Sequence, residues 1–397
     1  MKLTDRQGFS LMTAFLFGNV LSGIGGNGAG PKTGYLSVWL SFAIFVVFSL
    51  LFQKVVNHHP NCDFFTVTRN CFGKIGNRIF LIILALYSLA ASYLSIANYM
   101  EFIKYSITTN FPLTTGILLV LLLTVYLCLK EEKIMGRFAE IILPIVIGSV
   151  ILLLILGIRE IKEITLPLPT MTSQFLRQGW QLFCSPFSEI IFLWILFDSF
   201  KNQQNIGEIS IKAGLLTTFL FTLVYLFNLN IAGETVLQNT RFPTYFCASL
   251  IEVGILVENA ESFITLSYSF CDILYGALCL WIGVKAICRL LKSAKCFRKK
   301  IRTRPDNAIK DCGRVPRNLV VFTIKKITAF SAVIFMFLLY SSGMIPTDLS
   351  AYYPIISTIF LPITVGLPLL LFFLTKKTKK NKKSKRNQNS NSFSEKL

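Results

Sequence analysis

The stretch Gly18-Asn-Val-Leu-Ser-Gly-Ile-Gly-Gly-Asn-Gly28 interrupts the first apolar segment of this 397-residue chain. The stretch Cys184-Ser-Pro-Phe-Ser-Glu189 interrupts the sixth apolar segment. Glycine and proline weaken or break a helix, so each segment is predicted to contain a discontinuity. Paired breaks in corresponding helices of two halves indicate a binding site near the membrane midplane. These two stretches therefore predict both the fold and the place of a site.

Composition excludes an ordinary soluble protein, because 53% of the residues are hydrophobic, only 15% are charged and the mean hydropathy is +0.60. A membrane span needs about 20 mostly apolar residues. Ten segments qualify: 9–24, 35–56, 79–103, 113–129, 138–158, 181–200, 209–229, 263–290, 319–339 and 352–374. They show no alternation of polar and apolar residues, which favours helices over barrel strands. The sequence predicts an all-α integral membrane protein with ten transmembrane helices.

The distribution of charged residues predicts on which side of the membrane each end of these helices lies. Segment 285–326 carries 14 basic and 2 acidic residues, and segment 376–397 carries 9 basic and 1 acidic residue. Basic residues also follow the second, fourth and sixth spans, whereas the connection after the seventh is acidic. Cytoplasmic loops carry the excess of Lys and Arg in polytopic membrane proteins. We therefore expect both termini in the cytoplasm of a multi-pass cell membrane protein.

This orientation gives the two halves opposite topology, because the first span runs outward and the sixth runs inward. We expect a single transmembrane domain over 1–374, built as a five-plus-five inverted repeat with broken helices 1 and 6. Repeat one covers about 9–158 and repeat two about 181–374. A basic cytoplasmic loop (292–318) and a basic, disordered cytoplasmic tail (375–397) are expected to attract anionic membrane lipid rather than nucleic acid.

Polar residues at the two breaks and inside neighbouring spans are the candidate ligand-binding residues. Opened helix turns free N–H groups that attract a carboxylate and carbonyls that attract an amine or cation. Ionisable side chains inside spans are costly and often functional. The candidates are Gly18, Asn19, Ser22, Gly23, Asn98, Glu101, Ser185, Pro186, Ser188, Glu189, Ser267, Asp272 and Tyr275. Taken singly, the glycines could instead serve close helix packing, and Pro186 could be a tolerated kink.

Other charged residues receive simpler interpretations. Glu140 is expected in an interfacial salt bridge with its neighbour Arg137, Asp198 is expected to face headgroups, and Lys285 is expected to reach the interface with its long side chain.

Catalysis finds little support in the sequence. The histidines, His58 and His59, are adjacent, and with Cys62 and Cys71 they match no zinc spacing. No Walker-type glycine loop occurs, and no histidine lies in a span for a hydrolytic site. We expect no enzyme activity, no cofactor and no metal. The first apolar segment lacks a small-residue cleavage site, so it is expected to be retained as a helix.

Several short motifs resemble the B-subunit, permease-like family of bacterial spore germination receptors. They are Phe138-Ala-Glu-Ile-Ile-Leu-Pro144, Gln178-Gly-Trp180, Pro186-Phe-Ser-Glu-Ile-Ile191, Glu101-Phe-Ile-Lys104, Arg241-Phe-Pro-Thr244 and Glu258-Asn-Ala-Glu261. The resemblance runs from Leu3 to about Lys377. The chain departs from the family in its richer glycine run after the first span and its longer basic loop.

The resemblance implies a LeuT/APC-like fold, similar to that of amino acid–polyamine–organocation transporters. It also implies a subunit in the inner membrane of the spore that binds a small-molecule germinant, such as an amino acid. A-type and C-type germinant receptor subunits would be its partners. By motif, Glu101 takes the acidic position that ends the third span, and Pro186 with Glu189 takes the sixth-span break. The alternative is a proton- or cation-coupled amino acid transporter of the same fold, with Glu189 or Asp272 as the coupling carboxylate.

Overall fold

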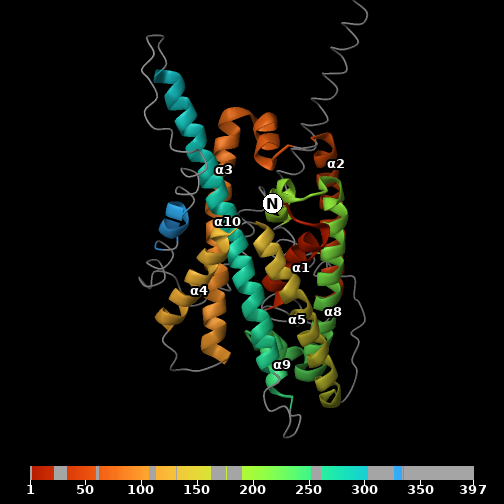
Figure 1. The fold of residues 1–397 in the computed structure, drawn as a ribbon. Coiled ribbons are helices and arrows are strands. Elements are labelled where there is room, and N and C mark those ends of the chain that lie inside the picture. The colour runs from red at the N-terminus through yellow and green to blue at the C-terminus, as the bar shows by residue number, and fades with distance from the viewer. Residues whose placement is uncertain are drawn as a thin grey trace, which may run out of the picture.

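The computed structural model describes residues 2–21, 34–59, 62–106, 113–130, 132–161, 176, 190–251, 261–302, 326–332 and 334. These residues are almost entirely helical (Figure 1). The α-helices are α1 (Asp5–Leu21), α2 (Gly34–His58), α3 (Phe64–Ser106), α4 (Leu113–Leu129), α5 (Glu132–Gly157), α7 (Ile190–Ile195), α8 (Ile206–Asn239), α9 (Pro243–Ser249) and α10 (Glu261–Arg302). Short 3₁₀ turns are η1 (Ile158–Glu160), η3 (Leu196–Ser199) and η4 (Gln203–Asn205).

Within the described residues, five helices are long and apolar enough to cross a membrane, and 115–129 forms a shorter apolar helix. The chain is therefore a multi-pass membrane protein with an all-helical fold. Of the expected sixth span, 181–200, the structure describes 190–200, which form α7 continued by η3. The spans expected at 319–339 and 352–374 lie largely outside the described residues, so the number ten stays a prediction.

Helix α10 lies at the centre of the bundle. It packs lengthwise on α3 and also contacts α1, α4 and α5, while α2 and α8 lie side by side across the molecule (Figure 1). α10 is more deeply buried than the outer helices. In its apolar stretch 83% of the residues are buried, against 39% for α2 and for the span that begins at Glu132. A helix that is mostly buried belongs to the core, so α10 is the element on which a site can be built.

Two glycines bend the long helices at the ends of their membrane stretches. Gly73 in α3 has φ +72° and Gly233 in α8 has φ +74°. Glycine adopts this left-handed region at little cost, whereas other residues are strained there. The bends explain why α3 begins before, and α8 ends after, the segments 79–103 and 209–229 expected from hydropathy.

The beginning of the chain is tied to the connection after the sixth span. The Leu3 N–H donates to the Ser199 carbonyl at 2.7 Å, and the Lys201 N–H donates to the Leu3 carbonyl at 2.9 Å. Asn205 Nδ2 also donates to Asp5 Oδ2 at 3.0 Å. The charge pattern places the N-terminal residues and the connection after the sixth span on one side of the membrane. In the structure both lie at one end of the bundle. Which side of the membrane this end faces stays a prediction.

Candidate ligand-binding site

A line of polar side chains joins α3 to α10. Ser92 Oγ donates to the Gly276 carbonyl at 2.9 Å, and Asn98 Nδ2 donates to the Tyr268 hydroxyl at 2.8 Å. Residue numbers rise along α3 as they fall along α10, so the helices are antiparallel. We call this line the α3–α10 seam; it comprises Ser92, Ser95, Asn98 and Tyr99 on α3 and Tyr268, Ser269, Asp272 and Gly276 on α10.

Asp272 lies in the middle of the seam and is 5% exposed. Ser95 Oγ donates to the carboxylate oxygen Oδ1 at 3.4 Å and to the main-chain carbonyl of Asp272 at 3.3 Å. The Tyr268 hydroxyl, one turn earlier on α10, faces the same carboxylate. Oδ2 is buried and has no partner at hydrogen-bond distance in the described part of the chain. A buried carboxylate oxygen without a partner is unusual and points to a function.

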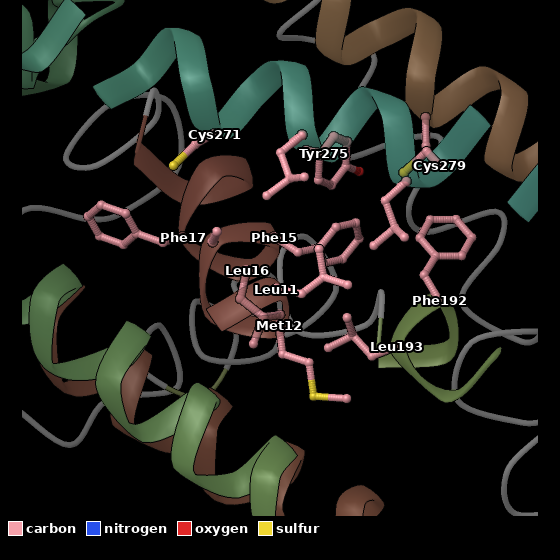
Figure 2. Packing of buried hydrophobic residues seen from close by; sticks show 14 of the residues in the cluster. Leu11, Met12, Phe15, Leu16, Phe17, Phe192, Leu193, Cys271, Tyr275 and Cys279 are labelled. Carbon is pink, nitrogen blue, oxygen red and sulfur yellow. The ribbon is translucent and has the colours of Figure 1, made fainter. Parts of the chain in front are cut away.

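Four spans meet at an aromatic cluster formed by Phe15 of α1, Tyr87 of α3, Phe192 of α7 and Tyr275 of α10. Phe15 stacks on Tyr275 with the ring centroids 4.7 Å apart, and it meets Phe192 edge-on at 6.2 Å. Tyr87 stacks on Phe192 at 5.1 Å. Figure 2 shows Phe15 and Tyr275 turned toward each other, with Phe192 approaching from the green α7 ribbon. The cluster joins the first, third, sixth and eighth expected spans.

Gly18 lets α1 approach α10 closely. A Cβ at this position would lie 2.8 Å from Cys271 Cβ and 3.1 Å from the Cys271 backbone, so a larger residue does not fit without a shift. Close helix packing, the simpler of the two interpretations of this glycine, is what the geometry shows. Asn19 is the next residue of α1, of which the structure describes only the backbone.

Ser267 lies one helical turn before Cys271 on α10, so the two side chains share a face. Phe15 pairs with Tyr275 and Gly18 with Cys271, so α1 and α10 are antiparallel. Ser267 therefore lies level with the C-terminal end of α1, directly before the glycine-rich stretch. Its Oγ is buried without a hydrogen-bond partner in the described part of the chain.

Glu101 lies away from the aromatic cluster, at the other end of the seam. It forms an ion pair with Arg241, which lies between α8 and α9. Tyr245 of α9 donates its hydroxyl proton to the Ser106 carbonyl at 2.8 Å. Burial, followed by the nearby Glu261 carboxylate and Tyr105, raises the pKa of the Tyr245 hydroxyl. Glu101 thus fastens α9 to the end of α3, and the structure shows it in a structural ion pair.

The opposite end of the bundle holds further ion pairs. Lys285 Nζ lies 3.2 Å from Asp198 Oδ1 and 4.0 Å from Glu132 Oε1, and it sits 4.3 Å above the Trp281 ring. Asp198 and Lys285 therefore neutralise each other, and their expected position at the membrane interface stays a prediction. The salt bridge expected between Glu140 and Arg137 is formed instead with Arg6, at 3.7 Å.

The remaining candidates, Ser22, Gly23, Ser185, Pro186, Ser188 and Glu189, lie outside the described residues. Of the candidates that are described, Asn98, Asp272, Ser267, Gly18 and Tyr275 come together on α10 and the helices packed against it. Glu101 lies one turn further along α3 than Asn98 and pairs with Arg241.

Sequence reasoning missed Ser95, Tyr268, Phe15 and Phe192. One signal was available for the serine, because Ser88, Ser92 and Ser95 recur at helical spacing in an otherwise apolar segment and so share one face of α3. No comparable signal marks the aromatic residues, since the chain contains 36 phenylalanines. Only their contacts distinguish Phe15 and Phe192.

A family model described as "Spore germination protein" matches residues 2–297. The Bacillus subtilis (strain 168) spore germination protein YndE is 25% identical over 237 residues, which cover 58% of this chain and 64% of that protein. The match thus spans somewhat less than two thirds of the length of this curated relative.

Two solved structures are similar in fold. MhsT in complex with L-phenylalanine superposes with a TM-score of 0.50 at 13% identity, covering 94% of this chain and 99% of that one. A mutant of the Eremococcus coleocola manganese transporter superposes with a TM-score of 0.53 at 13% identity, covering 93% of this chain and 78% of that one. At this identity the likeness concerns the fold, which is that of LeuT-like transporters.

Proposed function

This chain belongs to the spore germination protein family, and we propose that it is the membrane subunit of a germinant receptor. In this proposal a small nutrient germinant, such as an amino acid, binds between α1, α3, α7 and α10. Binding favours one of two conformations, and A-type and C-type subunits in the spore inner membrane respond to that shift. Only a difference in affinity between the two conformations is required of the ligand.

The convergence of four spans beside two sequence breaks carries the proposal. The orphan hydroxyl of Ser267 faces the end of α1, where the glycine-rich stretch follows in the sequence. Residues 184–189 directly precede α7, whose Phe192 contacts Phe15 of α1. The described parts of the two interrupted segments, α1 and α7, therefore contact each other in one aromatic cluster. This is the arrangement in which opened turns can hold a ligand.

The chemistry of such a site suits an amino acid. Free N–H groups at a helix start attract the ligand carboxylate, and free carbonyls attract its ammonium group. The fold itself accommodates such a ligand, since the similar MhsT structure was determined in complex with L-phenylalanine. Because fold alone does not fix function, this likeness supports a ligand class and not a particular germinant.

A second candidate is a cation-coupled amino acid transporter of the same fold. The observation in its favour is Asp272, a buried carboxylate with an unpartnered oxygen inside a transmembrane helix. A coupled transporter requires a carboxylate that binds and releases a cation during the cycle. A receptor does not require this step, so transport measurements separate the two candidates.

The test uses the purified chain in liposomes with radiolabelled amino acids. We expect saturable binding of at least one amino acid, without accumulation when a proton or sodium gradient is imposed. Gly23→Leu and Pro186→Leu should weaken binding at least tenfold at normal abundance, because they fill or rewind the opened turns. Glu208→Gln is the matched control, since Glu208 lies on the surface of α8 in an exposed pair with Lys212.

Spores carrying Glu189→Gln should need a higher germinant concentration while reaching the normal maximal response. Accumulation driven by a gradient, and lost in Glu189→Gln, would instead establish the transporter. Normal binding in both break variants would place the ligand elsewhere in the protein.

A further inference from the structure

Asp272 is deeply buried and has no basic partner among the described residues. Five other acidic side chains with 25% or less exposure each lie within ion-pair distance of a base: Glu101 of Arg241, Asp63 of Arg289, Asp198 and Glu132 of Lys285, and Glu140 of Arg6. Asp272 is the most deeply buried of these acids, yet no Lys, Arg or His of the described residues pairs with it. Among the described residues, these carboxylates are balanced by a neighbouring base, whereas Asp272 is not.

The groups that face Asp272 are neutral oxygen and sulfur groups. From α3, Ser95 donates to Oδ1, and the Tyr99 hydroxyl lies within electrostatic range. From α10 itself, Tyr268 faces the carboxylate and Cys271 is its chain neighbour. A negative charge buried among such groups is costly in a membrane protein unless a cation accompanies it. We infer that Asp272, Ser95 and Tyr268 form an intramembrane binding site for a small monovalent cation, either H⁺ or Na⁺.

The tightness of the seam limits the size of the cation. Ser92 Oγ touches the Gly276 carbonyl one turn beyond Asp272, and a Cβ at Gly276 would lie 3.5 Å from Ile96. The helices are therefore in direct contact beside the carboxylate. We therefore expect the seam to admit a proton or a bare alkali ion in preference to an ammonium group carried on an organic molecule.

The charge of the site limits the valence. It contains a single carboxylate, and the described residues contain no group of three or more His, Cys, Asp or Glu side chains that would hold a divalent metal. The available donors are the two carboxylate oxygens, a hydroxyl and a phenol, and hard oxygen donors of this kind suit hard cations. One negative charge balances one positive charge, so the site matches H⁺ or Na⁺ rather than Mn²⁺.

The inference goes beyond the proposed receptor and does not depend on the transporter alternative, because a receptor and a transporter can both contain a structural cation site. A bound cation would stabilise the contact between α3 and α10, the central pair of the bundle. Any ion that binds the folded state alone raises the unfolding midpoint with concentration. Stability therefore reports on the site without a germinant.

The experiment measures thermal unfolding of the purified full chain in detergent. One arm replaces choline chloride by NaCl at constant ionic strength, and the other lowers the pH from 8 to 5. We expect at least one arm to raise the midpoint of the wild-type protein relative to Asp272→Asn, which keeps the shape and removes the charge. Glu208→Gln should respond as the wild type does, because its carboxylate is on the surface.

A sodium response lost in Asp272→Asn identifies Na⁺, and an acid response lost in this variant identifies H⁺. If Asp272→Asn does not fold, Ser95→Ala gives the same information. It should raise the half-saturating Na⁺ concentration several-fold, or shift the pH midpoint of stabilisation, because it removes the donor to Oδ1. Equal responses of wild type and variants in both arms, or no response in either, would overturn the site.

Discussion

At the scale of single residues, the contact of Gly18 with Cys271 sets the distance between α1 and α10. The hydrogen atom of the glycine is all that separates the backbone of α1 from a fully buried side chain on the central helix. Small residues that allow such contacts are the usual means of helix association in membranes, where the hydrophobic effect does not hold helices together. The contact also holds Ser267 level with the end of α1.

Gly18→Ala should therefore destabilise the protein by about 1–3 kcal/mol, the usual cost of overpacking a close contact. The new Cβ would lie 2.8 Å from Cys271 Cβ, a distance that requires one helix to move. Thermal unfolding in detergent measures the effect. Gly148→Ala in α5 is the control, since a Cβ there meets nothing within 4 Å. Equal stability of the two variants would show that α1 shifts without cost.

At the scale of elements, α9 is held against the end of α3 by aromatic contacts and one ion pair. Phe102 of α3 meets Phe242 edge-on at 5.2 Å and Tyr245 at 5.6 Å. The pair of Glu101 and Arg241 lies beside these rings, with the two side chains 21% and 26% exposed. Because both side chains are largely buried, this ion pair contributes more to stability than a solvent-exposed pair. Removing only one of its two partners is therefore strongly destabilising.

A double-mutant cycle on Glu101→Gln and Arg241→Gln should give a coupling energy of about 1 kcal/mol or more. The same cycle on Glu208 and Lys212 of α8, whose side chains are 66% and 64% exposed, should give about 0.3–0.5 kcal/mol. Each single variant of the sheltered pair should also expose 240–251 to protease. A coupling energy no larger than that of the control pair would mean that the aromatic rings hold α9 alone.

The elements also show what could be predicted from sequence. Hydropathy located α2, α4, α5 and α10, because a long apolar run has a local signal. The positive φ of Gly73 and Gly233 was not predicted, because a single glycine in a sequence does not show which backbone conformation it adopts. Partners such as Ser95 for Asp272, 177 positions apart, depend on how helices pack, and a single sequence does not contain that information.

At the scale of the whole molecule, the connections that charge assigns to one side gather at one end of the bundle. Leu3 contacts the residue pair at 199–201, Arg289 pairs with Asp63, and Lys285 lies near Glu132. The end of α3, α9 and the start of α10 lie at the opposite end, as the path of the ribbon shows (Figure 1). The helices thus alternate in direction as the positive-inside bias requires, and the remaining question is which end faces the cytoplasm.

Cysteine labelling answers this question, and one native thiol does not interfere with it. Burial raises the pKa of Cys247 to about 12, so at pH 8 only about one part in ten thousand is thiolate, the reactive form. In a background that keeps only this cysteine, Asn239→Cys should react with a membrane-impermeant maleimide from outside intact cells. Arg314→Cys should react only after permeabilisation, because the basic loop 292–318 is expected in the cytoplasm. The parent carrying Cys247 alone should stay unlabelled in both conditions. Labelling of Arg314→Cys from outside would reverse the orientation, and the proposed germinant site would then be expected to open to the opposite side of the membrane.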